Sequence, residues 1–99
     1  MKILLVCAGG MSTSILMQKM EKYWQKIGEE LNIKAVGLAE YQEEAQSFDI
    51  IMVGPQVGYK IDEIKRDTNK PTEVIQSYDY AIGNCENIHK IAEKLYKEI

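Results

Sequence analysis

The sequence predicts an α/β fold, a three-layer α/β/α sandwich with a four-stranded parallel sheet. Two observations lead to this prediction. Short apolar runs typical of buried strands alternate along the chain with segments whose apolar residues recur at helical spacing. Strands that alternate with helices imply right-handed crossovers, which make the strands parallel and place helices on both faces of the sheet. The length of 99 residues and the apolar content of 45% suit a single domain, residues 1–99, with its own core.

Four strands are predicted, over residues 3–6, 33–38, 50–53 and 72–75. The first and the third are unbroken apolar runs with β-branched members, which is the pattern of strands buried on both faces of a sheet. The second is less apolar, and we expect it at an edge of the sheet. The fourth follows a break at Asn69-Lys70-Pro71, and the segment from its end to Tyr80 is expected to be a loop.

Helices are predicted between these strands and at the end of the chain. A long amphipathic helix is expected to begin at an N-cap formed by Ser12 or Thr13. Its last apolar position is Leu31, and Asn32 is expected to end it. Shorter helices are expected over residues 40–47, over residues 57–64 and from the N-cap residue Asn84 to Ile99.

The charge of the chain argues against nucleic acid as a partner. The formal net charge is −3 and the sequence pI is about 5.2, so no broad positive field is available to neutralise a phosphate backbone. A local basic stretch contains Lys60, Lys65, Arg66 and Lys70. We expect it to be a solvated surface.

The sequence also predicts a cytoplasmic location. The N-terminal apolar run is far shorter than the core of a secretory signal, and nowhere do eighteen apolar residues run together. Two cysteines occur, Cys7 and Cys85, and in a reducing cytoplasm we expect both to be free thiols. One histidine and two isolated cysteines cannot complete a tetrahedral site, so we expect neither a metal nor another cofactor.

Two residues of the last predicted helix are expected to have no part in chemistry. His89 is expected to be a lone exposed histidine. Cys85 stands at the start of the helix, a position that favours a lowered pKa, but no glycine-rich loop surrounds it. We expect Cys85 to be structural.

The segment from Cys7 to Ser14 predicts the site of chemistry. It links a buried strand to a long helix, and its glycines let successive backbone N–H groups converge on one anion beside the helix N-terminus. The same field favours the thiolate form of cysteine, which is the nucleophile. We therefore expect Cys7 to accept a phosphoryl group. The expected phosphate-binding residues are Ala8, Gly9, Gly10, Met11, Ser12, Thr13 and Ser14.

Other glycine-rich loops fit this segment less well. A Walker loop needs a lysine where Met11 stands, and a dinucleotide-binding loop needs a third glycine. The main alternative is a cysteine phosphatase of the low-molecular-weight type, which needs an arginine six residues after the cysteine, where this chain has Thr13. The chain also has no Asp-Pro general-acid pair. A nonenzymatic anion sensor is a third possibility.

The motifs together resemble the enzyme IIB component of the lactose/chitobiose (cellobiose) family of phosphoenolpyruvate-dependent sugar phosphotransferase systems. The resemblance rests on the loop Cys7 to Ser14, on Gly54-Pro55-Gln56, on Lys70-Pro71 before Val74-Ile75, and on Tyr80. Gly9 departs from the family, whose members often have alanine there. The resemblance implies a four-stranded parallel sheet and the fold of the low-molecular-weight tyrosine phosphatases.

The resemblance also implies a phosphotransferase activity of the EC 2.7.1 type and two partners. A phosphohistidine on the IIA protein would give its phosphoryl group to Cys7, which would pass it to a β-linked disaccharide bound by the membrane permease IIC. A domain that alternates between partners is expected to be a monomer. An apolar rim around Cys7, formed by Met11, Pro55 and Tyr80, is expected to dock both partners. Gln56 and Gln76 are further candidates for phosphate contact.

Overall fold

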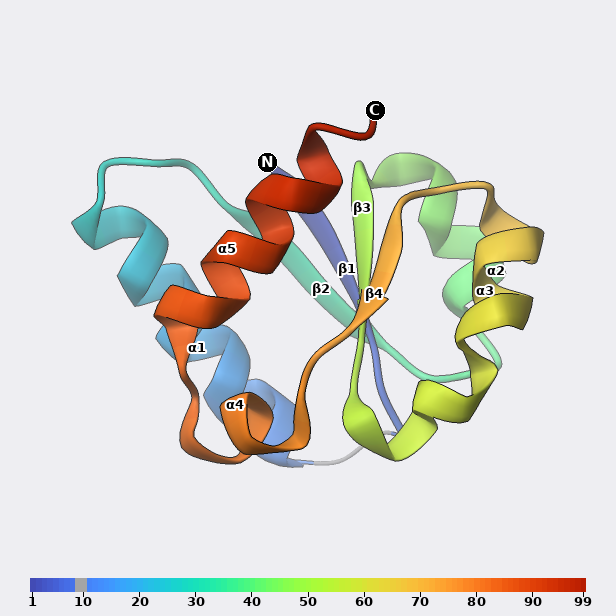
Figure 1. The fold of residues 1–99 in the computed structure, drawn as a ribbon, viewed down its shortest axis with the longest axis horizontal. Helices are drawn as coiled ribbons and strands as arrows, with labels where there is room; N and C mark the ends of the chain where they lie inside the picture. The colour runs from blue at the N-terminus through green and yellow to red at the C-terminus, as the bar shows by residue number, and fades with distance from the viewer. Residues whose placement is uncertain (9–10) are drawn as a thin grey trace.

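Four parallel strands form one sheet at the centre of the molecule (Figure 1). The structure, a computed structural model, describes residues 1–8 and 11–99, without the side chains of Met11 and Ser12. The strands are β1 (Lys2–Val6), β2 (Asn32–Val36), β3 (Ile50–Val53) and β4 (Thr72–Val74). Their order in the sheet is β2-β1-β3-β4, so the predicted parallel sheet and the edge position of the second strand are confirmed.

The register of the sheet aligns the carboxyl ends of its strands. Val6 at the end of β1 pairs with Val36 of β2 on one side and with Val53 of β3 on the other. Val53 in turn pairs with Val74 of β4. The loops that follow all four strands therefore begin at the same edge, where ligands of open parallel sheets bind.

Helices cover both faces of this sheet (Figure 1). They are α1 (Met11–Lys26), α2 (Tyr41–Glu44), α3 (Ile61–Thr68), α4 (Ser77–Ile82) and α5 (Cys85–Tyr96), with 3-10 turns at Ala45–Ser47 and Pro55–Lys60. α1, α4 and α5 lie on one face, and α2 and α3 lie on the other. The three-layer α/β/α sandwich is confirmed.

Alternation along β1 divides the core between the two faces. Ile3 and Leu5 pack with residues of α1 and α5, whereas Leu4 and Val6 pack with residues of α2 and α3. All four side chains are fully buried, as expected for a central strand whose successive side chains point to opposite faces.

The first helix differs from its prediction at both ends. α1 begins at Met11, so Ser12 and Thr13 lie inside its first turn and are not N-caps. It ends at Lys26 because Gly28 adopts a left-handed conformation with φ of 78°, which terminates a helix. Leu31 therefore lies in the connection to β2, and Asn32 is the first residue of that strand.

The segment after β4 contains a helix where a loop was expected. α4 is only six residues long, too short for apolar periodicity to reveal it from sequence. Gly83 ends it in the left-handed region with φ of 66°, and Lys19 donates a 3.5 Å hydrogen bond to the carbonyl oxygen of Ile82. The predicted cap of the last helix is confirmed, since the Asn84 side chain accepts a hydrogen bond from the Asn87 N–H. No helix in the described part of the chain is long and apolar enough to cross a membrane.

Candidate active site

Cys7 stands immediately after β1, at the carboxyl edge of the sheet. Its backbone N–H donates to the Val36 carbonyl oxygen at 2.9 Å, and the Gly54 N–H donates to the Val6 carbonyl oxygen at 2.8 Å. Both neighbouring strands thus position the backbone at Cys7. The side chain is 4% exposed, and its Sγ donates a weak hydrogen bond to the Val36 carbonyl oxygen at 3.5 Å.

A cavity of about 450 Å³ opens beside Cys7, between α1 and the edge strand β2. From the first two turns of α1 it is lined by Thr13, Ser14 and Met17. The first N–H groups of a helix have no partner within the helix and attract anions. The cavity therefore brings a thiol, two hydroxyl side chains and the N-terminal part of a sixteen-residue helix together.

The remaining residues of the predicted phosphate-binding loop are described only in part. Ala8 is exposed, and Gly9 and Gly10 are not among the described residues. Met11 and Ser12 belong to the first turn of α1, and their side chains are not described. The predicted rim residue Met11 is therefore placed only by its backbone.

Tyr80 of α4 reaches the start of α1. Its hydroxyl lies 3.1 Å from Oγ1 of Thr13, which is only 3% exposed. Tyr80 also lines a hollow of about 280 Å³ together with Pro55 and Gln56, so three residues singled out in the sequence meet next to the loop. Gln76 is exposed at the start of α4.

Gln56 and Cys7 both approach Gly54. A Cβ atom added at Gly54 would lie 3.3 Å from Oε1 of Gln56 and 3.7 Å from Cβ of Cys7. The absence of a side chain at Gly54 therefore allows the segment after β3 to approach the segment after β1.

Two charged residues that line the Cys7 cavity were not singled out from the sequence. Glu40 follows β2 and accepts a 3.0 Å hydrogen bond from the Gly37 N–H through Oε2. Lys34 of β2 lines the same cavity, and its Nζ lies 2.9 Å from a carboxylate oxygen of Glu44. The position of Glu40 in the sequence could have indicated this. Residues 37–40 follow β2 at the same edge of the sheet where Cys7 follows β1.

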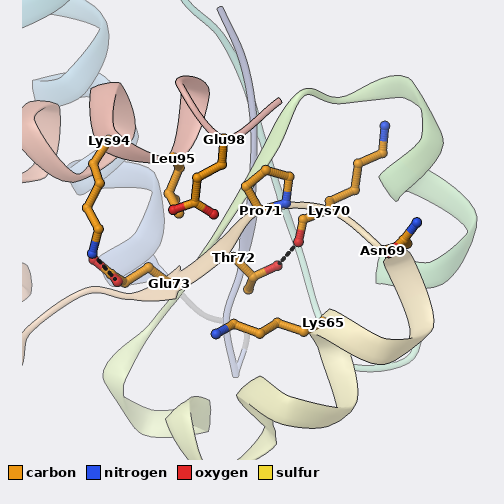
Figure 2. Close-up of a pocket in the computed structure, with 9 residues that line it drawn as sticks. All are labelled: Lys65, Asn69, Lys70, Pro71, Thr72, Glu73, Lys94, Leu95 and Glu98. Atoms are coloured by element: carbon orange, nitrogen blue, oxygen red, sulfur yellow. Dashed lines mark hydrogen bonds and ion pairs between the residues drawn. The ribbon is translucent and has the colours of Figure 1, made fainter.

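A larger cavity, of about 520 Å³, lies at the amino end of β4, and Figure 2 shows the residues that line it, which do not include Cys7. Lys65 and Lys70 of the basic stretch line it, and Lys94 lines it from α5 with its Nζ 3.1 Å from Oε1 of Glu73. Among the described residues its lining contains no cysteine, histidine or serine, and its one hydroxyl group, that of Thr72, donates to the Lys70 carbonyl oxygen at 2.8 Å. The smaller cavity, which contains Cys7, is therefore the candidate active site.

Cys85 and His89 are both buried residues of α5. Cys85 packs in the hydrophobic core, as expected of a structural cysteine, and burial raises the pKa of its thiol, partly opposed by the charge of Lys19. The expectation for His89 was wrong. His89 is 8% exposed rather than solvated. Its Nε2 lies 2.8 Å from Oε1 of Glu29, and its Nδ1 lies 3.4 Å from Oε1 of Glu93. Both cysteines are free thiols, as predicted.

Glu29, His89 and Glu93 also place their ligand atoms within 4.8 Å of one another. The two ring nitrogens of His89 face different carboxylates, so the imidazole lies between the two glutamates. This arrangement connects α5 to the segment after α1.

Comparison with known proteins identifies the family. A family model described as "PTS system, Lactose/Cellobiose specific IIB subunit" matches residues 2–93. The chain belongs to this family. It is 37% identical over 97 residues to the oligo-beta-mannoside-specific EIIB component of Bacillus subtilis (strain 168), a match that covers 95% of this chain and 94% of that protein.

A solved structure of an IIB protein has the same fold. The solution structure of the cellobiose-specific phosphotransferase IIB component protein from Borrelia burgdorferi matches with a TM-score of 0.81 and 32% identity, covering 99% of this chain and 93% of that one. The chain thus has the IIB fold, which resembles that of the low-molecular-weight tyrosine phosphatases. The resemblance seen in the sequence is confirmed.

A further relative is much longer than this chain. Over 68 residues the chain is 28% identical to the lactose-specific EIICB component of Lactococcus lactis subsp. lactis, a match that covers 69% of this chain and 12% of that protein. The IIB chain is accordingly a sugar-specific component of a phosphotransferase system of the lactose/cellobiose type.

Proposed function

We propose that this IIB protein is a phosphoryl carrier that holds the phosphoryl group on Cys7. The observation that supports this most strongly is the position of Cys7, whose thiol lines a cavity together with the first two turns of α1. Backbone N–H groups of the loop and of the helix start would bind the phosphoryl oxygens. The proposed phosphate-binding residues are Ala8, Gly9, Gly10, Met11, Ser12, Thr13 and Ser14.

The proposed reaction has two transfer steps. In the first, the Cys7 sulfur attacks the phosphorus of a phosphohistidine on a IIA protein. The S–P bond forms, the N–P bond breaks with its electron pair returning to the imidazole, and the thiol proton goes to the released histidine. In the second step, a sugar hydroxyl oxygen attacks the phosphorus, the S–P bond breaks, and the hydroxyl proton returns to the thiolate.

The proposed partners follow from these two steps. The donor is a phosphohistidine protein of the IIA type, and the acceptor is a β-linked disaccharide of the cellobiose, chitobiose or lactose type held by a membrane IIC permease. The EIICB relative, in which the two components are named together, supports a IIC partner. We place the chain in the cytoplasm as a monomer, because a single small domain must meet two partners in turn.

The cavity favours a carrier over a phosphatase. Thr13 stands at the loop position where a phosphatase has its arginine, and its hydroxyl is engaged by Tyr80. The only cationic side chain among the described residues that line the cavity is Lys34, which pairs with Glu44. Neutral donors would hold the phosphoryl group without the charged clamp that accelerates its hydrolysis.

The test is the intact mass of the protein after incubation with phosphoenolpyruvate, the general phosphotransferase proteins and a IIA donor. We expect one phosphoryl adduct on the wild type, none on Cys7→Ser, and the wild-type adduct on Cys85→Ala, which removes the other thiol. The adduct should persist until a sugar-loaded IIC acceptor is added. Absence of an adduct on the wild type, with a donor shown to be active, would refute the proposal.

An aryl phosphate separates the carrier from the phosphatase. A phosphatase releases inorganic phosphate continuously from such a substrate, whereas a carrier gives at most stoichiometric labelling that stops. Sustained, Cys7-dependent release would favour the phosphatase.

A further inference from the structure

We infer that the carboxylate of Glu40 raises the phosphoryl-transfer potential of the protein by placing a negative charge in the Cys7 cavity. This inference rests on the proposed function, since it concerns the stability of phosphocysteine at that site. It assigns a role in the energetics of transfer to a residue that lies 33 positions away from Cys7 in the sequence.

The position of Glu40 is set by the turn after β2. Its Oε2 accepts a 3.0 Å hydrogen bond from the Gly37 N–H, which folds the side chain back onto the end of the strand. A Cβ atom added at Gly37 would lie 3.7 and 3.8 Å from the two carboxylate oxygens and 4.0 Å from the Cys7 carbonyl oxygen. Gly37 thus approaches both the carboxylate and the Cys7 backbone, and Glu40 and Cys7 line the same cavity.

Among the described residues, none forms an ion pair with the Glu40 carboxylate, and the one cation that lines the cavity pairs with another residue. Among the described lining residues the only other charged side chain is Lys34, and its Nζ pairs with Glu44 at 2.9 Å. A phosphoryl group on Cys7 would bring up to two further negative charges into the cavity. Repulsion by Glu40 then raises the free energy of phosphocysteine relative to the free thiol.

This effect suits a carrier, which must release the group it accepts. The phosphoryl group passes between the histidine of the donor and Cys7. The equilibrium constant of this exchange therefore measures the stability of phosphocysteine relative to phosphohistidine. Backbone donors of α1 favour phosphocysteine, and the Glu40 carboxylate opposes it. The same charge also disfavours binding of free inorganic phosphate.

The decisive variant is Glu40→Gln, because glutamine keeps an oxygen that accepts from Gly37 but has no charge. Glu43→Gln is the matched control, since Glu43 is exposed in the adjacent α2 helix and does not line the cavity. The measurement is the equilibrium constant for phosphoryl exchange with phosphorylated IIA, read from intact masses. We expect Glu40→Gln to shift it about two- to fivefold toward phosphocysteine. Glu43→Gln should leave it unchanged.

Salt provides a second measurement that needs no variant. Because Glu40 is exposed, added salt screens its charge, and the difference between the wild type and Glu40→Gln should shrink as salt rises. The wild-type constant should itself move toward phosphocysteine as salt rises, which keeps the inference testable if the variant fails to fold.

Two results would overturn the inference. One is an equilibrium constant for Glu40→Gln equal to that of the wild type, and the other is a wild-type constant that does not respond to salt. If Glu40→Gln matches the wild type and only Glu40→Ala changes the equilibrium constant, through a loss of stability, the role of Glu40 is limited to forming the turn after β2. Failure of the proposed function gives a different result, because the wild type would then form no phosphoryl adduct with the phosphorylated IIA donor at all.

Discussion

The hydroxyl pair between Thr13 and Tyr80 connects two segments of the candidate site that are far apart in the sequence. Thr13 lies in the first turn of α1 and is almost completely buried, while Tyr80 belongs to α4. The two oxygens are 3.1 Å apart. A buried hydroxyl that loses its partner keeps its desolvation cost, so this contact stabilises the start of α1 beside Cys7.

Tyr80→Phe should therefore lower both stability and the rate of transfer. We expect the free energy of unfolding to fall by about 1 kcal/mol, since one buried hydroxyl becomes unpaired, and adduct formation at Cys7 to slow because the start of α1 is less firmly held. Urea denaturation and the time course of the mass adduct measure the two effects. Tyr78→Phe is the control, because Tyr78 is 70% exposed on the same helix. Equal behaviour of the two variants would contradict the expectation.

The residues of the site differ in how well the sequence predicted them. Cys7, Thr13 and Ser14 were identified because the composition of one short segment is enough to suggest an anion site, and the structure brings these three together. Glu40 was missed because it reaches the cavity from the end of another strand. His89 was expected in solvent because nothing local to it reports that the Trp24 ring packs against it, with ring centroids 4.8 Å apart, or that Glu29 lies 2.8 Å from Nε2.

At the scale of elements, a hydrogen bond between side chains joins α2 to α3 on the face of the sheet opposite α1. The Tyr41 hydroxyl donates to Oδ2 of Asp67 at 2.6 Å, and Nε2 of Gln42 donates to the same oxygen at 2.9 Å. The hydrogen bond from Tyr41, followed by that from Gln42, lowers the pKa of Asp67 below its ordinary value of 3.8. Burial, followed by the hydrogen bond to Asp67, raises the pKa of Tyr41 above its ordinary value of 10.0.

These shifts predict how the contribution of the contact depends on pH. A depressed carboxyl pKa stabilises the fold above pH 3.8, and this contribution is lost as the pH falls through the folded-state pKa of Asp67. A raised tyrosine pKa stabilises the fold below pH 10.0, and this contribution is lost as the pH rises through the folded-state pKa of Tyr41. The stability difference between the wild type and Tyr41→Phe should thus be largest between these limits.

Urea denaturation across the pH range measures that difference, and an NMR titration of the Asp67 carboxyl gives its pKa in both proteins. Tyr41→Phe removes the first donor to Asp67, so the pKa of Asp67 should rise toward 3.8 in the variant. A stability difference that does not change with pH, together with an unmoved Asp67 titration, would show that the contact has no electrostatic role.

The helices and strands that are long or fully buried were the ones that the sequence predicted best. β1 and β3 were evident as apolar runs because both of their faces are covered, and α5 was evident from its periodicity and its Asn84 cap. α4 was missed because six residues give too little periodicity. The end of α1 was placed too late because apolar residues continue past Gly28, whose left-handed conformation ends the helix.

At the scale of the whole molecule, two apolar clusters share one sheet. Leu5 lies in the cluster that contains Trp24, and Leu4 lies in the cluster on the opposite face. Adjacent residues of β1 thus connect the two halves of the core through a single strand. We propose that both clusters unfold together as one domain, residues 1–99.

Leu4→Ala and Leu5→Ala test this coupling. Each should lower the free energy of unfolding by about 2 to 5 kcal/mol, since both side chains are fully buried. Because Trp24 is fully buried in the Leu5 cluster, its fluorescence reports that face directly. If the domain unfolds as one cooperative unit, Leu4→Ala should lower the urea midpoint of unfolding measured by this fluorescence, as Leu5→Ala does. A midpoint that moves only for Leu5→Ala would mean that the two faces unfold separately.

The sequence by itself determined the α/β class, the parallel sheet, the edge position of the second strand and the loop that contains Cys7. These features depend on hydrophobic periodicity and on the composition of short segments, which are local properties of the chain. Only the tertiary structure decided which other residues surround Cys7, that Tyr80 engages Thr13, and that His89 is buried. These contacts form where the ends of separate strands and helices meet. The local sequence around each residue does not indicate which distant residues will lie beside it.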